Sequence, residues 1–100
     1  MFDYTLKYRT LVAYIGGDID HANAPQIKLS LDNLIKSESF DNFVIDLSAV
    51  TFMDSSAVGL IMGRYKLLKS MGKSVSFSKP SSVADKVLKV SGLYTIINKI

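Results

Sequence analysis

The chain of 100 residues contains no cysteine and only one histidine, His21. Without cysteine there is no disulfide and no thiolate metal site, and one histidine cannot build a histidine-rich metal centre. The sequence also lacks a long apolar run, and its N-terminus carries charges where a signal segment would be apolar. We therefore expect a cytoplasmic protein with no cofactor, no metal and no membrane span.

Positive charge is scarce in the first half of the chain and acidic charge in the second. Residues 1–54 hold four lysines and arginines against eight acids, whereas residues 55–100 hold eight against one. A basic half suits nucleic acid or an anionic membrane. However, single-sign runs are absent, so we expect neither partner. Five lysines instead fall on the polar sides of two expected helices, namely Lys66, Lys69, Lys73, Lys86 and Lys89.

Alternating apolar residues at the start of the chain predict a strand over 2–8. A second strand is expected over 11–17, separated from the first by Arg9 and Thr10, and the short connection indicates an antiparallel hairpin. One face of the first strand should be buried, and it carries Phe2, Tyr4, Leu6 and Tyr8.

Helices and strands are expected to alternate along the rest of the chain. The spacing of Ile27, Leu31, Leu34 and Ile35 predicts an amphipathic helix, with Asn23 as its N-cap and Gln26 as the capping-box partner. Such alternation implies parallel pairing, so we expect a single α/β domain over 1–100 with a mixed sheet. The further elements are a buried strand over 43–47, a helix over about 55–70 and a strand over 73–78.

A third helix is expected in the segment KPSSVADKVLKVSG. Ser82 is its predicted N-cap, with Asp85 at the capping-box position and Gly92 at its end. Its predicted apolar stripe consists of Val83, Val87 and Val90. The β-prone residues 93–100 predict a last strand.

The triplet Asp54, Ser55 and Ser56 lies between the predicted central strand and the helix expected after it. Open α/β sheets place their binding sites at this end of the strands. One residue of the triplet suffices as a cap, which leaves either a spare serine or a site of modification. A phosphoryl group on Ser55 would be tolerated at the helix N-terminus while changing the charge of the surface. The residues alone leave both interpretations open.

Gly59 and Gly63 share one face of the helix that follows. Each glycine lowers the stability of the helix by ~1 kcal/mol relative to alanine, so we expect the pair to serve a purpose in packing or binding. Close packing against the sheet is the favoured explanation, and the approach of a partner to the exposed helix is the alternative.

The segment FMDSSAVGLIMGRYKLLK resembles the phosphorylation-site helix of the anti-sigma factor antagonists, which are small single-domain members of the STAS class. GGDIDHANA is similar to the family's loop after the second strand, and SGLYTII to the segment before its last strand. The GRY continuation is closest to the sporulation sigma-F type. Ala57 stands where the family usually has glycine, and the chain ends at Ile100, where many members carry another helix.

The resemblance implies a STAS fold and a regulatory protein that is not an enzyme. Its partners would be an anti-sigma factor with serine kinase activity and a metal-dependent serine phosphatase. The unphosphorylated form would bind the anti-sigma factor and so release the sigma factor. Phosphorylation of Ser55 would end that binding, and the phosphatase would restore it. The expected partner-binding residues are Asp20, His21, Asp54, Ser55, Ser56, Gly59 and Met62.

Two other functions are weighed against this one. The chain could be a STAS scaffold or adaptor without a switch, in a stress-signalling or membrane-associated complex. It could also be an enzyme with Ser55 as nucleophile and His21 as base. The sequence has neither the G-x-S-x-G elbow nor a G-x-x-x-x-G-K phosphate loop, which disfavours the enzyme.

Overall fold

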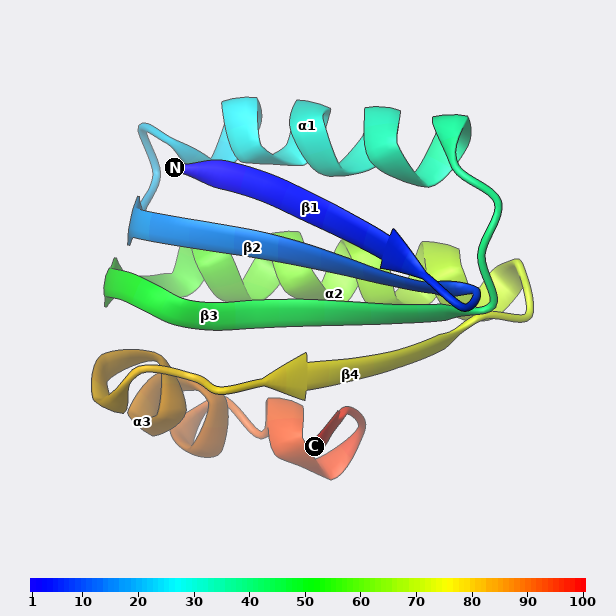
Figure 1. The fold of residues 1–100 in the computed structure, drawn as a ribbon. Coiled ribbons are helices and arrows are strands. Elements are labelled where there is room, and N and C mark those ends of the chain that lie inside the picture. The colour runs from blue at the N-terminus through cyan, green and yellow to red at the C-terminus, as the bar shows by residue number, and fades with distance from the viewer.

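A five-stranded sheet runs through the computed structural model, which describes all 100 residues (Figure 1). Its strands lie in the order of the chain. β1 (Phe2–Lys7) and β2 (Thr10–Ile19) pair antiparallel. β3 (Asn42–Met53), β4 (Ser74–Ser78) and β5 (Asn98–Lys99) then add parallel to β2. The mixed sheet confirms the predicted α/β class.

Two helices, α1 (Ala24–Ser37) and α2 (Ser55–Ser70), lie side by side along the sheet, while α3 (Ser82–Val90) packs against β3 (Figure 1). A single cluster of 22 buried residues fills the space between sheet and helices. The predicted stripe of α1 is confirmed, because Leu31, Leu34 and Ile35 are buried. None of the helices is long and apolar enough to cross a bilayer.

β3 is the central strand, and it is longer than predicted. Its first half, 43–47, is buried throughout because neighbouring strands flank it on both sides. The strand then continues to Met53, pairing with β2 through two register shifts. This extension carries the chain directly to Asp54, at the carboxyl end of the sheet.

The opening hairpin turns one residue earlier than expected. Tyr8 and Arg9 form the two-residue turn, with φ angles of 51° and 66°, and Thr10 already belongs to β2. The predicted buried face of β1 is wrong as well, since Tyr4 and Leu6 are 44% and 40% exposed. The helices pack over the inner strands, α1 on β2 and α2 on β3 and β4, so they leave this face of the edge strand β1 largely uncovered.

The third helix is capped by Ser81 in place of the predicted Ser82, since the Ser81 hydroxyl accepts a hydrogen bond from Ala84 N at 3.2 Å. The predicted valine stripe is correct only for Val87, which packs against the core, whereas Val83 and Val90 are exposed. Ala84 and Leu88 face the core, whereas Val90 is 83% exposed. The valines and the pair Ala84 and Leu88 both recur with the helical period. The small Ala84 lets α3 approach β3 closely. Val83 and Val90 are therefore left at the surface.

The predicted last strand over 93–100 is mostly absent. Gly92, at φ 81°, ends α3, and the 3₁₀-helix η1 (Leu93–Thr95) follows it. Only the two residues of β5 pair with β4.

Four of the five surface lysines of the two helices lie as predicted, but Lys73 precedes β4, where its Nζ donates to Phe40 O at 2.6 Å.

A carboxylate on α3 holds the C-terminal segment. Asp85 accepts a hydrogen bond from the Tyr94 hydroxyl at 2.5 Å and forms ion pairs with Lys89 and Lys99 at 3.2 and 3.4 Å. These contacts, led by the Tyr94 hydrogen bond, lower the pKa of Asp85 from 3.8 to about 2. The segment after α3 is thereby fastened by polar contacts at the surface.

We expect Asp85→Asn to lower stability at neutral pH and to approach the wild type in acid. The folded pKa of Asp85 lies below its unfolded value, so the carboxylate stabilises the fold above pH 3.8 and this contribution is lost toward pH 2. Urea unfolding at neutral pH and near pH 2 measures the difference. Asp3→Asn, at an exposed carboxylate of β1, is the control. A deficit that persists undiminished in acid would contradict the assignment.

Candidate functional site

Asp54, Ser55 and Ser56, here called the DSS turn, connect β3 to α2. Asp54 is the N-cap of the helix: its Oδ1 accepts from Ser56 N at 2.8 Å, and its backbone carbonyl accepts from Ala57 N at 3.1 Å. Neither serine is therefore needed as the cap. Ser55 is the first residue of α2 and is exposed.

The same carboxylate also holds the neighbouring loop between β2 and α1. Its Oδ2 accepts from His21 N at 3.2 Å, while Asp54 N donates to Ile19 O at 3.4 Å. The backbone of the loop is thus attached directly to the start of α2. Asp54 consequently brings two of the predicted site segments together, the DSS turn and the segment that contains Asp20 and His21.

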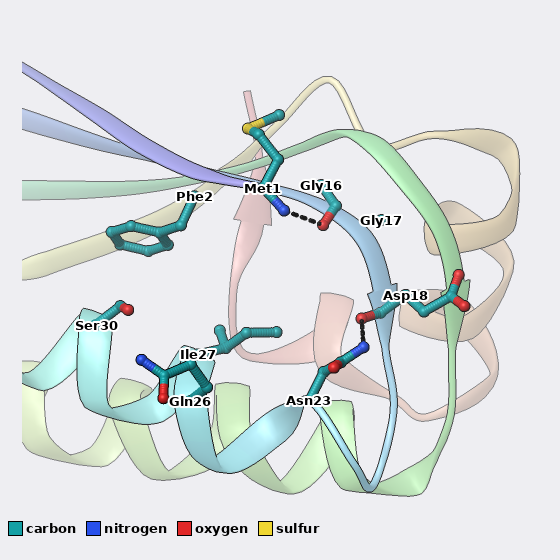
Figure 2. Close-up of a pocket in the computed structure, with 9 residues that line it drawn as sticks. All are labelled: Met1, Phe2, Gly16, Gly17, Asp18, Asn23, Gln26, Ile27 and Ser30. Atoms are coloured by element: carbon teal, nitrogen blue, oxygen red, sulfur yellow. Dashed lines mark hydrogen bonds between the residues drawn. The ribbon is translucent and has the colours of Figure 1, made fainter.

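The loop is further fixed by its own side chains. Asp20 Oδ1 accepts from Asn23 N at 2.9 Å, and Asn23 Nδ2 donates to Asp18 O at 3.0 Å (Figure 2). Asn23 is the N-cap residue of α1, as predicted, but its side chain makes no capping hydrogen bond to the helix. The amide of Asn23 closes the loop instead, and the His21 residue lies exposed on it.

An apolar cleft separates the start of α2 from α3, and we call it the α2–α3 cleft. Its volume is about 380 Å³. The exposed valines of α3 explain its character, and the sequence interpretation missed them because it assigned them to the core. The cleft is lined by Met53, Asp54, Ser55, Val58, Lys86, Val87, Val90 and Ser91.

A second depression, the α1–α2 groove, begins on the other side of the DSS turn. Its volume is about 460 Å³. A Cβ added at Gly59 or Gly63 would meet no atom within 4 Å, so the predicted packing of these glycines against the sheet is wrong. The groove is lined by His21, Ala24, Pro25, Lys28, Ser56, Gly59, Leu60, Gly63 and Arg64.

The structure gathers most of the predicted site residues at one end of the sheet. Asp20 and His21 lie on the loop that Asp54 holds, and Ser55 and Ser56 begin α2 beside them. Gly59 lies one turn further along, in the α1–α2 groove. Met62 departs from this group, since it is partly buried and packs against the core.

The geometry gives no support to a serine nucleophile. The group of His21 that contacts the DSS turn is its backbone N–H, and no hydrogen bond joins its imidazole to the Ser55 hydroxyl. A nucleophilic serine requires a base within hydrogen-bond reach. No group of three or more acidic or histidine side chains is placed to hold a metal ion.

A further cavity of about 390 Å³ lies between the N-terminus, β2 and α1 (Figure 2). The Met1 ammonium group donates to Gly16 O at 3.2 Å there. A Cβ at Gly16 would lie 3.0 Å from Ala49 Cβ and 2.8 Å from Met1 Cε, the mobile end of the Met1 side chain, so a larger residue would crowd this place. The cavity contains no residue of the DSS turn.

Comparison with known proteins gives a consistent result. The profile of the STAS domain family matches residues 2–100. The anti-sigma F factor antagonist of Paenibacillus polymyxa is 30% identical over 87 residues, which are 87% of this chain and 74% of that protein. The solved structure of the anti-sigma factor antagonist SpoIIAA in its unphosphorylated form is 28% identical, with a TM-score of 0.81 over 100% of this chain and 88% of that one. The Bacillus cell fate determinant SpoIIAA in the phosphorylated form is 27% identical, with a TM-score of 0.73 over 100% and 91%.

We expect Asp54→Ala to destabilise the fold by about 0.5–2 kcal/mol, because it removes the cap of α2 together with the contact to the loop. Ser55→Ala is the matched control, at an exposed residue that does not cap the helix, and should stay within about 0.5 kcal/mol of the wild type. Urea unfolding followed by circular dichroism compares the two. Equal stability of both variants would show that Asp54 does not hold the turn.

Proposed function

The chain belongs to the STAS domain family, and we propose that it acts there as an anti-sigma factor antagonist whose binding is switched off by phosphorylation of Ser55. The observation that carries this proposal is the position of Ser55. It is exposed at the first position of α2, at the open end of the sheet, and the residue before it already caps the helix.

A phosphoryl group on Ser55 is compatible with this fold. The N-terminus of a helix favours negative charge, so the group would lie where the helix dipole attracts it. The cap hydrogen bond from Ser56 N to Asp54 would not have to be broken, since Ser55 takes no part in it. Lys86 lines the same cleft as Ser55 and supplies a positive charge nearby. The modification would therefore change the surface and preserve the structure.

The α2–α3 cleft explains why such a change would end binding. In the unphosphorylated state a partner meets a bare hydroxyl among apolar side chains such as Val58 and Val87. Phosphorylation adds about −1.5 to −2 charge at that point. A partner surface that matches the apolar cleft would then have to remove a group of nearly two negative charges from water, with only Lys86 beside it, which is costly.

The partner proposed for this surface is an anti-sigma factor that is also the serine kinase for Ser55. Complex formation would free the sigma factor, and a metal-dependent serine phosphatase would return the protein to its binding state. Two kinds of relative support this assignment. One is named an anti-sigma F factor antagonist, and SpoIIAA has been solved in unphosphorylated and phosphorylated forms.

The positions of the other predicted partner-binding residues suggest what each would do in the complex. Asp20 and His21 would contact the partner from the loop beside the DSS turn, and Gly59 from the first turns of α2. Asp54 and Ser56 would shape the turn, as their mutual hydrogen bond indicates. Met62 would offer only part of its surface, because most of its packing is against the core.

The test is phosphorylation followed by binding. After incubation with ATP and the anti-sigma factor of the same organism, intact-mass measurement should show one added phosphate, which peptide mapping should place on Ser55. Calorimetry should show binding by the wild type, retained binding by Ser55→Ala and loss of binding by Ser55→Glu. Ser56→Ala is the matched control and should still be phosphorylated.

Two results would contradict the proposal. Phosphate uptake by Ser55→Ala would place the acceptor elsewhere. Binding of the anti-sigma factor by Ser55→Glu with wild-type affinity would remove the switch and leave a STAS adaptor, in which the two serines have no regulatory part.

A further inference from the structure

The outer edge of β1 pairs with no other strand. β2 is its one neighbour, and the sheet ends at β1. Met1 N donates to Gly16 O at 3.2 Å and Gly16 N donates to Met1 O at 2.8 Å, so these two residues form a hydrogen-bonded pair. Because backbone groups alternate between the two sides of a strand, the odd-numbered residues of β1 bond to β2. The backbone N–H and C=O groups of Phe2, Tyr4 and Leu6 therefore point to the open edge.

One hydrogen bond marks this edge as unpaired. Tyr4 N donates to Oδ1 of the preceding residue, Asp3, at 2.8 Å. A side chain thus occupies a donor that a further strand would use. An open row of backbone groups is a template for pairing with another chain, and proteins commonly protect it with charged side chains. β1 carries two such charges, Asp3 and Lys7, and both residues are exposed.

The placement of the two charges favours one partner strand, which is β1 itself. If two copies pair antiparallel about a two-fold axis at Thr5, Asp3 of each copy lies opposite Lys7 of the other. Opposite charges in such pairs attract, whereas like charges destabilise. The two pairs also fall at non-hydrogen-bonded positions of the ladder, where side chains are closest. An axis at Asp3 or at Lys7 would instead bring like charges together, so the charges favour the register centred on Thr5.

The other face of the same edge offers apolar contacts. In this register Tyr4 lies opposite Leu6 of the second copy, in a pair that exchanges backbone hydrogen bonds. The two residues are 44% and 40% exposed in the single molecule, because the helices pack over the inner strands. Phe2, on the same face, already packs against the core. Pairing would therefore bury Tyr4 and Leu6 of both copies beside the existing core.

We propose that this chain forms a two-fold dimer in which β1 pairs antiparallel with β1 of a second copy. The contact uses the same surface on both copies and closes on itself, so it ends at two copies and joins their sheets into one. An edge of six residues is smaller than a standard protein interface, and the dimer should dissociate reversibly. β1 contributes no residue to the α2–α3 cleft or the α1–α2 groove, so this pairing does not depend on the proposed function.

Charge reversal tests the register. Sedimentation velocity at increasing protein concentration should show a monomer–dimer equilibrium for the wild type. Asp3→Lys and Lys7→Asp should each weaken self-association at least about tenfold, because each places like charges opposite one another in both pairs. Lys66→Asp is the matched control: it makes the same change of net charge as Lys7→Asp at an exposed position of α2, and it should associate like the wild type.

A mixture of the two reversed variants tests the complementarity itself. In an equimolar mixture of Asp3→Lys and Lys7→Asp, the lysines of one copy face the aspartates of the other, so dimers should form again. Misfolding of either variant cannot explain such a recovery. Amide hydrogen exchange of the wild type locates the contact. The Tyr4 and Leu6 amides should exchange more slowly as concentration rises, whereas the Thr5 amide, which bonds to β2 in either state, should change less.

Four results would overturn the proposal. The first is a wild type that stays monomeric up to about millimolar concentration. The second is self-association that both reversals leave unchanged, and the third is a mixture of the two variants that stays monomeric, because either places the contact elsewhere. The fourth is growth beyond the dimer, which requires a contact that does not close. Loss of self-association in each variant and its return in the mixture would support the dimer, whether or not the chain binds an anti-sigma factor.

Discussion

The carboxylate of Asp54 determines the arrangement on which the site depends. One oxygen caps α2 through Ser56 N, and the other accepts from His21 N on the neighbouring loop. The residue at the end of β3 therefore fixes both the start of the helix and the position of the loop. Asp54, the residue before Ser55, supplies the cap of α2. Ser55 is therefore exposed at the first helical position and is not needed to cap the helix.

The DSS turn lies between two depressions of different character. On the side of α3, the cleft next to Ser55 is apolar and is lined by Val87 and the exposed Val90. On the side of α1, the groove next to Ser56 combines an open backbone with two cations, Lys28 and Arg64, that share the carboxylate of Asp32. A partner that covers the turn would contact both, so a charge placed on Ser55 acts at the middle of one continuous surface.

Some of this organisation can be predicted from the sequence, because burial leaves a periodic pattern. The apolar stripe of α1 and the nearly all-apolar start of β3 identify core elements of the correct type. The valines of α3 also fit the helical period, yet Ala84 and Leu88 are the residues that face the sheet. Periodicity alone does not distinguish two stripes on one short helix.

The candidate site could be predicted only in part, for a related reason. The polar triplet predicts the start of a helix. Which of its three residues is the cap depends on the backbone conformation and the hydrogen bonds of the folded turn. The hydrogen bond between His21 N and Asp54 joins residues 33 apart in sequence, so no local sequence pattern predicts it. Asn23 occupies the N-cap position of α1, but its side chain is turned toward the loop, where Nδ2 donates to Asp18 O, and makes no capping hydrogen bond. The open face of Gly59 and Gly63 likewise depends on where α1 lies.

The central claim is that a charge on Ser55 alters the surface and leaves the fold intact. The most direct measurement compares the amide NMR spectra of the unphosphorylated and Ser55-phosphorylated protein, with the anti-sigma factor added to each. The account predicts shifts confined to the first turns of α2, the loop around His21 and the α2–α3 cleft, with binding only by the unphosphorylated form. Shifts spread throughout the sheet, or equal binding by both forms, would contradict it.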